Sequence, residues 1–322
     1  MLDAVVSYCT LSSAQQMAAY LTNLVASCLS IIGSSAIIIN YLFFLGANKR
    51  NQPLYQLILY LSVSDFFGSI SICISQSVLL SSLTYYHSFC IIIRASINFF
   101  FVSSFMWMSC IAFHAFWSSR QRSQIPLIVF HAFSWGVPVI MTGVMVGKGM
   151  IIQEEDTGYC HPDPEARYLF WYGPLIFTFA WNILFYALIL WRYRASMRPM
   201  GENMDRNSIN TQQTASHRFV SERKRKIHAK VARQLGVYLL AFLICWLPDL
   251  IDNFVATPAR YCELYWLWVL QNFTTPLQGF LNFIVYGITS RMFLRCKTTP
   301  TDIRALHESR SQKISLLRGV AD

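Results

Sequence analysis

Seven long apolar runs alternate with polar connections along the chain. They cover residues 17–45, 53–80, 89–117, 125–146, 169–191, 234–256 and 265–287. Each run exceeds the ~20 apolar residues that a helix needs to cross the hydrocarbon core of a bilayer. Closed barrels also span membranes, but their strands are short segments of alternating hydrophobicity. The pattern therefore predicts an all-α protein, a bundle of seven transmembrane helices.

The composition agrees with a membrane protein and excludes two other classes. Hydrophobic types make up 54% of the 322 residues and charged types 13%, about half the ~25% charge that is typical of soluble domains. A water-soluble enzyme of this size would need more charged surface. The 15% of aromatic residues excludes a disordered chain. We therefore expect the lipid bilayer, and no nucleic acid, as a partner of this basic protein.

The Lys and Arg residues of the connections predict the orientation, because cytosolic connections are rich in them. Twenty-two lie in the connections 46–52, 118–124 and 192–233 and in the segment after 290, against three on the opposite side. The N-terminus is therefore expected outside and the C-terminus in the cytosol. This divides the chain into a short extracellular segment (1–16), a transmembrane domain (17–290) and a cytoplasmic tail (291–322).

Three cysteines acquire candidate roles from this topology. Cys90 opens the third apolar run and Cys160 lies in the longest outer connection. Disulfides persist on the outer side of a cell, so we predict a bridge between these two residues. Cys296 lies just beyond the last run, where palmitoylation is a candidate modification.

Polar side chains inside the apolar runs are costly and need a partner or a function. Asp65 lies in the middle of the second run. Gln271, Thr275, Gln278 and Asn282 follow one face of the seventh run at helical spacing. Such stripes face other helices rather than lipid. They have two interpretations, polar contacts that hold the bundle together or a polar interior that rearranges between states.

A second polar group is predicted in the outer half of the bundle. Arg94 in the third run and the pair Asp249 and Asp252 in the sixth run should lie at similar depth. They suit either a salt bridge between two helices or the walls of a pocket for a polar ligand, and the two roles are compatible. The candidate ligand-binding residues are Arg94, Asn98, Trp246, Asp249, Asp252, Asn253 and Gln271.

The sequence offers little for catalysis. No nucleophile–base pair or metal-binding cluster stands out, and the two histidines within the runs, His114 and His131, belong to different helices. No run contains a Lys for a retinal Schiff base. We therefore expect no enzyme, no metal and no cofactor. A seven-helix transporter stays an alternative, although repeated halves and broken helices are not evident.

Several stretches resemble motifs of G-protein-coupled receptors. Residues 61–65 (Leu-Ser-Val-Ser-Asp) resemble the second-helix signature that ends in Asp, and residues 245–248 (Cys-Trp-Leu-Pro) resemble a sixth-helix element. Trp135 lies in the fourth run, as receptors commonly have it. Residues 276–287 resemble the seventh helix of the slime-mould cyclic AMP receptors and their animal orphan relatives. The resemblance covers about residues 20–296.

Two departures favour this cAMP-receptor-like branch over the rhodopsin-like one. Rhodopsin-like receptors end the third helix with an acidic-Arg-aromatic triplet, whereas residues 114–120 read His-Ala-Phe-Trp-Ser-Ser-Arg. Phe283 replaces the Pro that rhodopsin-like receptors have after Asn282, although the spacing to Tyr286 is kept.

The resemblance implies a receptor in the cell membrane that passes an extracellular signal to a cytosolic heterotrimeric G protein. It also implies that Asp65 and Asn282 meet across the bundle, directly or through water. The candidate switch residues are Asp65, Trp246, Pro248, Gln278, Asn282 and Tyr286. The alternative is a seven-helix transporter or intracellular membrane protein without G-protein coupling.

The basic segment before the sixth run is a candidate coupling element. Residues 222–233 contain no Gly or Pro, so we expect the sixth helix to extend into the cytosol. The residues Arg225, Lys226 and Lys230 would then contact the G protein. The polar stretch 200–221 is expected to be disordered.

Overall fold

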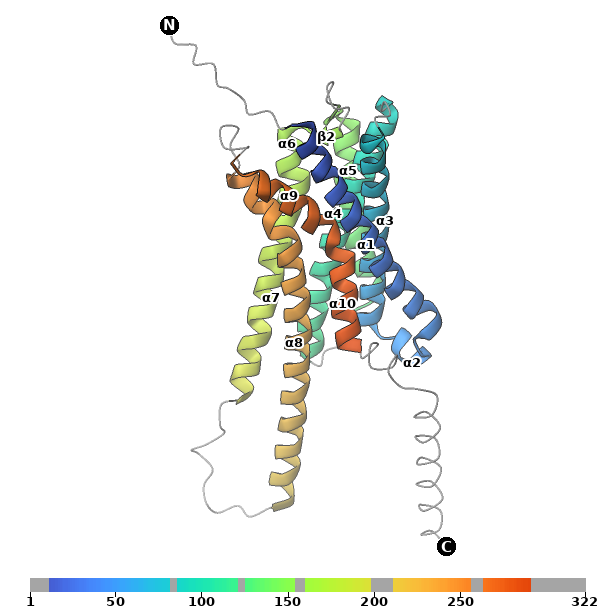
Figure 1. Ribbon diagram of the computed structural model, residues 1–322. Coiled ribbons are helices and arrows are strands. Elements are labelled where there is room, and N and C mark those ends of the chain that lie inside the picture. Colours follow the sequence, from blue (N-terminus) through green and yellow to red (C-terminus); the bar gives the residue numbers. More distant parts are fainter. Residues whose placement is uncertain are drawn as a thin grey trace, which may run out of the picture. The chain divides into compact units, whose positions relative to one another are not determined.

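The computed structural model describes residues 12–81, 86–120, 125–153, 160–197, 211–255 and 263–290. It contains two compact units, residues 1–283 and residues 284–322, and the bundle described below is that of the first unit (Figure 1). Most of the expected extracellular segment and the whole expected tail, with Cys296, lie outside the described residues.

Among the described residues of the first unit, six helices are long and apolar enough to cross a membrane. The first is α1 (Ser13–Ile39) with a π-helical extension (Asn40–Phe44), and a short α2 (Ala47–Arg50) follows it. The next three are α3 (Pro53–Leu80), α4 (His87–Ser119) and α5 (Leu127–Gly147). The fifth runs from α6 (Pro164–Arg167) through a π-turn (Tyr168–Tyr172) into α7 (Gly173–Met197), and the sixth is the apolar part of α8 (Thr211–Val255).

The seventh apolar run does not form one continuous helix. It is divided into α9 (Tyr265–Thr274), a 3₁₀ turn (Thr275–Leu277) and α10 (Gln278–Ser290). Pro276 lies in the turn, and proline lacks the N–H that a continuing helix would use. The all-α prediction is confirmed, with a break where we expected an unbroken helix over 265–287.

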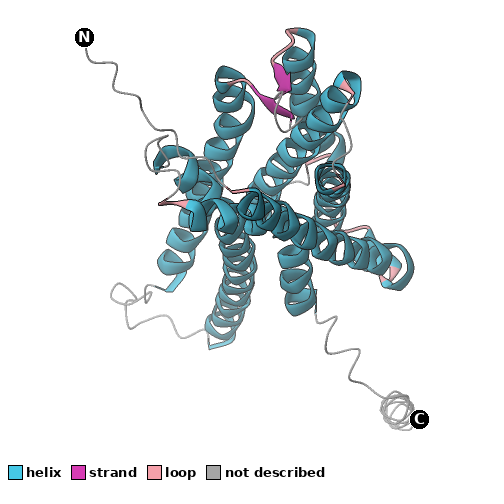
Figure 2. Ribbon diagram, turned by 45° about the horizontal axis from the view of Figure 1, so that its top comes forward, coloured by secondary structure: helices cyan, strands magenta, loops and turns pink. Residues whose placement is uncertain are grey.

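The helices of the first unit form a ring in which α4 lies between α3 and α7. Consecutive contacts run from α1 to α3, α4, α7, α8 and α9, and α9 returns to α1, while α5 packs against α4. Figure 2 shows that helices make up nearly all of the described chain, with one short pair of strands. Residues 101 to 112 of α4 are buried without interruption. The middle of α4 is therefore the core of the bundle, and side chains of four other helices meet it.

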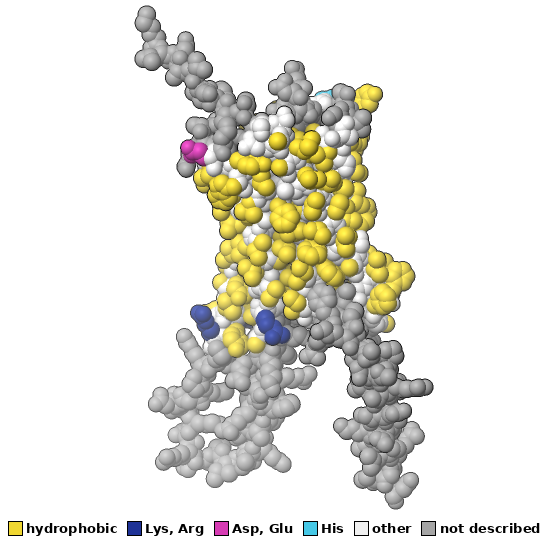
Figure 3. Space-filling view, in the orientation of Figure 1, with side chains coloured by type: hydrophobic (Ala, Val, Ile, Leu, Met, Phe, Trp, Pro, Cys, Tyr) yellow, Lys and Arg dark blue, Asp and Glu magenta, His cyan; other side chains and the backbone are white. Residues whose placement is uncertain are grey.

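The surface of this bundle is apolar over most of its height. Figure 3 shows hydrophobic side chains over this face, with Lys and Arg side chains at its lower edge. Large aliphatic residues such as Ile128 and Ile140 are 70% and 66% exposed. So much exposed apolar area is expected of a surface that contacts lipid.

Helix α8 continues far beyond its apolar part. It is helical from Thr211, so the predicted extension over 222–233 is confirmed, whereas the disorder predicted for 200–221 is wrong from residue 211 onward. The reason is local, because residues 211–233 lack Gly and Pro and are rich in Gln, Ala, Lys and Arg, which favour helix. The side chains of Arg225, Lys226 and Lys230 lie outside the described part of the structure.

A disulfide and a small hairpin close one end of the bundle. Strands β1 (Ile151–Gln153) and β2 (Cys160–Pro162) pair in antiparallel fashion. Cys160 is bonded to Cys90 in the first turn of α4, with 5.6 Å between their Cα atoms. The predicted disulfide is confirmed, and it fixes β2 against α4.

Candidate functional site

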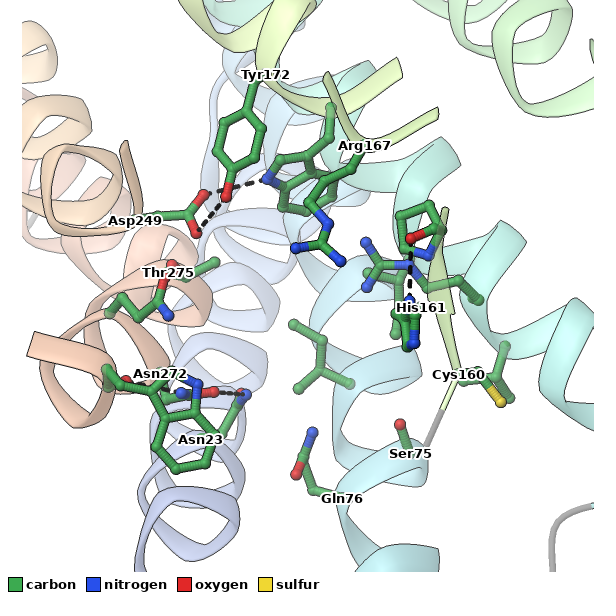
Figure 4. Close-up of a pocket in the computed structure, with 18 residues that line it drawn as sticks. Asn23, Ser75, Gln76, Cys160, His161, Arg167, Tyr172, Asp249, Asn272 and Thr275 are labelled. Atoms are coloured by element: carbon green, nitrogen blue, oxygen red, sulfur yellow. Dashed lines mark hydrogen bonds between the residues drawn. The ribbon is translucent and has the colours of Figure 1, made fainter. Parts of the chain in front are cut away.

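A cavity of about 290 Å³ lies beneath this hairpin (Figure 4). Its walls come from α1, α3, α4, β2, α6, the π-turn before α7, α8 and α9. Charged groups stand on several of these elements: Arg94 on α4, Arg167 on α6 and Asp249 on α8. The cavity therefore combines groups of both charges that are far apart in the sequence.

Trp171 connects two of the charged groups. The guanidinium carbon of Arg94 lies 5.4 Å from the centre of the Trp171 ring, a cation–π geometry. The indole N–H of Trp171 donates a hydrogen bond of 3.1 Å to Asp249, and the hydroxyl of Tyr172 donates a second one of 3.4 Å. The indole thereby links α4 to α8 at the cavity wall.

The same indole also touches the layer below the cavity. Its ring centre lies 5.7 Å from that of Trp246, which in turn packs edge-to-face on Phe101 and Phe105, with centres 5.5 and 4.7 Å apart. Trp246 is completely buried. Aromatic pairs at such distances favour specific mutual orientations, so a tilt of Trp171 would disturb the packing of Trp246.

A chain of hydrogen bonds continues from Trp246 to the middle of the bundle. The indole N–H of Trp246 donates to the side-chain oxygen of Gln278. Gln278 donates to Ser104 at 2.7 Å, and Ser104 donates to one carboxylate oxygen of Asp65 at 2.6 Å. The other carboxylate oxygen accepts from Asn282 at 2.8 Å. We call these five residues the polar chain, and they join α8, α10, α4 and α3.

The polar chain satisfies a carboxylate that would otherwise be expensive to bury. Asp65 is 1% exposed, and an unpaired buried polar group costs roughly 1–3 kcal/mol, more when charged. Each of its oxygens accepts one hydrogen bond from a neutral donor on another helix. The Asp65 side chain therefore joins three helices, α3, α4 and α10, and the rest of the polar chain adds α8.

The comparisons with known proteins decide the family. The model of the family "7 transmembrane receptor (rhodopsin family)" matches residues 35–286, most of the chain. The chain belongs to this receptor family. With the apolar helices, this makes the receptor a multi-pass membrane protein.

Individual proteins of known name are also similar to the receptor. Cyclic AMP receptor-like protein C of Dictyostelium discoideum is 33% identical over 249 residues, which cover 73% of the receptor and 64% of that protein. Protein B of the same name and organism is 29% identical, covering 77% and 53%. G-protein coupled receptor Mth2 of Drosophila yakuba is 25% identical, covering 76% and 45%. The receptor thus spans between about half and two thirds of the length of these proteins.

These relatives confirm the resemblance to the cAMP-receptor-like group. The matching family model nevertheless carries the rhodopsin name. The departures at residues 114–120 and at Phe283 therefore do not place the receptor outside that family. The alternative of a transporter is not favoured.

The cavity brings together only part of the predicted ligand-binding set. Arg94, Asp249 and Gln271 line it. Asp252 instead accepts a hydrogen bond of 2.7 Å from Gln271, and Asn98 donates to Thr142 of α5 at 3.3 Å. Trp246 lies below the cavity, and Asn253 does not line it.

Several residues at the site were missed by sequence reasoning. They are Asn23, His161, Arg167, Trp171, Tyr172 and Asn272 in the cavity, and Ser104 in the polar chain. The adjacent Ser103 and Ser104 in the middle of the apolar run 89–117 were a usable signal for a polar contact. No periodicity indicates that Trp171 reaches Asp249, 78 positions away.

Pro248 and Tyr286 remain predicted switch residues. Pro248 lies inside α8, two residues after Trp246, and its role as a hinge is a hypothesis. Tyr286 belongs to the second compact unit, so its place in the cluster stays a prediction. Among the described residues, no group of three or more His, Cys, Asp or Glu side chains could hold a metal ion.

Proposed function

We propose that the receptor converts the binding of an extracellular ligand in the cavity into a signal to a cytosolic heterotrimeric G protein. The observation that supports this most strongly is the unbroken set of contacts from the cavity to the middle of the bundle. It begins with Trp171 at the cavity wall, passes to Trp246 and continues through the polar chain to Asp65.

The contacts suggest how a ligand would act. A ligand that pulls Asp249 or Arg94 moves the Trp171 indole to which both are attached. Trp246 then repacks, and its bond to Gln278 holds or breaks accordingly. A ligand favours whichever helix arrangement it contacts better. Pro248 leaves one helix carbonyl without its donor, which gives α8 a place to pivot.

Helix α8 is the proposed carrier of the signal to the cytosol. It extends unbroken from Pro248 back to Thr211, so a pivot near Pro248 displaces its far end. The basic residues Arg225, Lys226 and Lys230 on this extension are the proposed G-protein contacts. The distribution of Lys and Arg along the sequence supports a cytosolic location for this end and for the C-terminus. The proposed location of the receptor is the cell membrane.

A charge-neutralising triple variant tests the proposal. Arg225→Gln, Lys226→Gln and Lys230→Gln together should reduce G-protein dissociation in cells at matched surface expression. The control is Arg225→Lys, Lys226→Arg and Lys230→Arg, which keeps every charge and should signal like the wild type. Equal signalling by the neutral triple variant contradicts a coupling role of these residues. Solute uptake by vesicles that contain the protein, without any G-protein response, contradicts the receptor function itself.

The ligand is the open part of the proposal. The names of two relatives mention cyclic AMP, so cyclic AMP belongs in a ligand screen of this receptor. The screen uses G-protein dissociation as its readout and the neutral triple variant as its background.

A further inference from the structure

The charges of the cavity are separated onto different walls. Figure 4 shows Asp249 on one side of the cavity and Arg167 and His161 across from it. Arg94 adds a second guanidinium group to the lining. Two guanidinium groups and one carboxylate therefore line the cavity, and a second carboxylate, Asp252, lies behind the lining residue Gln271.

The basic wall suits a carboxylate-type anion. A guanidinium presents a rigid planar fork of N–H donors that matches the two oxygens of a carboxylate. Arg167 is half-buried where it lines the cavity, and partial removal from water strengthens such a charge-assisted hydrogen bond. An anionic group of a ligand is therefore expected between Arg167 and Arg94.

The opposite wall suits a cation. The hydrogen bonds that Asp249 accepts within the described chain come from neutral donors, Trp171 and Tyr172. They orient the carboxylate, and its opposite charges, Arg94 and Arg167, are the two arginines that also line the cavity. A ligand that is only anionic would be repelled by Asp249, and one that is only cationic would be repelled by the two arginines.

Apolar side chains form another part of the lining. Ile72, Ile93, Ile97 and Trp268 line the cavity together with its polar residues, and small-molecule sites combine apolar side chains with placed polar groups. Trp268 offers an aromatic face on which a ring can pack. The body of the ligand should accordingly be aromatic or aliphatic.

We propose that this cavity binds a small zwitterion with an apolar body, of the chemical class of the amino acids. Its carboxylate lies between Arg94 and Arg167, and its ammonium group lies at Asp249. The proposal rests on the proposed function only in taking this cavity as the ligand site.

A binding experiment with four probes tests the proposal. It uses the purified full-length receptor in lipid nanodiscs, without G protein. Phenylalanine carries both charges, 3-phenylpropionate lacks the ammonium group, 2-phenylethylamine lacks the carboxylate, and cyclic AMP is an anion. Phenylalanine should bind about tenfold tighter or more than each of the others, the effect of one lost ionic contact. Equal or weaker binding of phenylalanine, no binding of any probe, or tightest binding of cyclic AMP overturns the proposal.

Two variants assign the charges to the walls. Arg167→Gln should weaken the binding of phenylalanine and 3-phenylpropionate about tenfold but leave 2-phenylethylamine unchanged. Asp249→Asn should weaken the binding of phenylalanine and 2-phenylethylamine but not that of 3-phenylpropionate. The amide of this variant keeps an oxygen that can accept the hydrogen bond from Trp171. Arg194→Gln and Glu165→Gln, outside the cavity, are the matched controls and should bind all probes like the wild type. If either cavity variant weakens the binding of all probes equally, at an unchanged thermal unfolding midpoint, the assignment is contradicted.

Failure of this proposal is distinguishable from failure of the proposed function. The binding assay contains no G protein, so an uncoupled protein still gives the predicted order of probe affinities. A receptor that dissociates G protein in cells but shows no preference for phenylalanine refutes the zwitterion and leaves the coupling intact.

Discussion

Trp246 and Gln278 join the sixth helix to the seventh by one buried hydrogen bond, from the indole N–H to the side-chain oxygen. The two side chains are 0% and 2% exposed. Gln278 also donates to Ser104, so its amide is held at both ends. Any rotation of the Trp246 indole is thereby coupled to the hydrogen bonds around Asp65.

Removing the indole N–H of Trp246 should destabilise the receptor. Trp246→Phe keeps an aromatic ring against Phe101 and Phe105 but leaves the oxygen of Gln278 without this donor, at a cost of roughly 1–3 kcal/mol. The matched control is Trp107→Phe, because Trp107 is equally buried and its N–H makes no hydrogen bond among the described residues. Thermal unfolding of the purified proteins should give the lower midpoint for Trp246→Phe. Equal midpoints would show that the bond contributes nothing.

Two adjacent serines separate a contact between helices from one within a helix. Ser104 accepts from Gln278 and donates to Asp65, whereas Ser103 donates only to the carbonyl of Phe99 on its own helix. Ser104→Ala leaves both partners short of a bond and should cost roughly 1–3 kcal/mol. Ser103→Ala should change the free energy of unfolding by less than about 0.5 kcal/mol, since the backbone keeps its helical bond. A larger loss for Ser103→Ala contradicts the assigned contacts.

The close approach of α1 to the start of α10 depends on glycine. A Cβ on Gly33 would lie 2.7 Å from the Cα of Phe280, a backbone atom that cannot move alone. Gly33→Ala should therefore lower the thermal midpoint, with a loss of roughly 1–3 kcal/mol from overpacking. Gly143→Ala in α5, where nothing lies within 4 Å, should be neutral or stabilise the helix. The reverse order of midpoints would refute the close contact.

The disulfide between Cys90 and Cys160 should be needed for delivery to the cell surface. Its loss releases β2 from α4, and such bonds typically contribute ~2–5 kcal/mol in small domains. Replacing both residues by Ser should reduce the surface level, whereas Cys28→Ser, at a free and exposed cysteine, should not. Mass spectrometry of non-reduced peptides from surface protein checks the bond itself, and two free thiols there would disprove it.

The helices could be predicted from the sequence, whereas the cavity could not. The length of bilayer-spanning runs predicts the helices directly, because lipid admits few other structures. The break at Thr275–Leu277 was not predicted, because transmembrane helices tolerate proline and Pro276 alone does not indicate where a helix ends. The contact between Asp65 and Asn282 was expected only through the motifs they resemble. The link from Trp171 to Asp249 arises from how two distant helices pack, which side-chain periodicity does not encode.

The central claim is that the contacts from the cavity to Asp65 control a G protein. Nucleotide exchange on purified heterotrimeric G proteins, with the receptor in nanodiscs, tests it most directly by comparing wild type with Asp65→Asn. That variant keeps the side-chain shape and removes the charge. We predict that the wild type accelerates exchange by at least one G protein above empty nanodiscs, and that Asp65→Asn changes this rate at the same receptor concentration and thermal unfolding midpoint. Identical rates for the two proteins, or no acceleration with any G protein, would contradict the account.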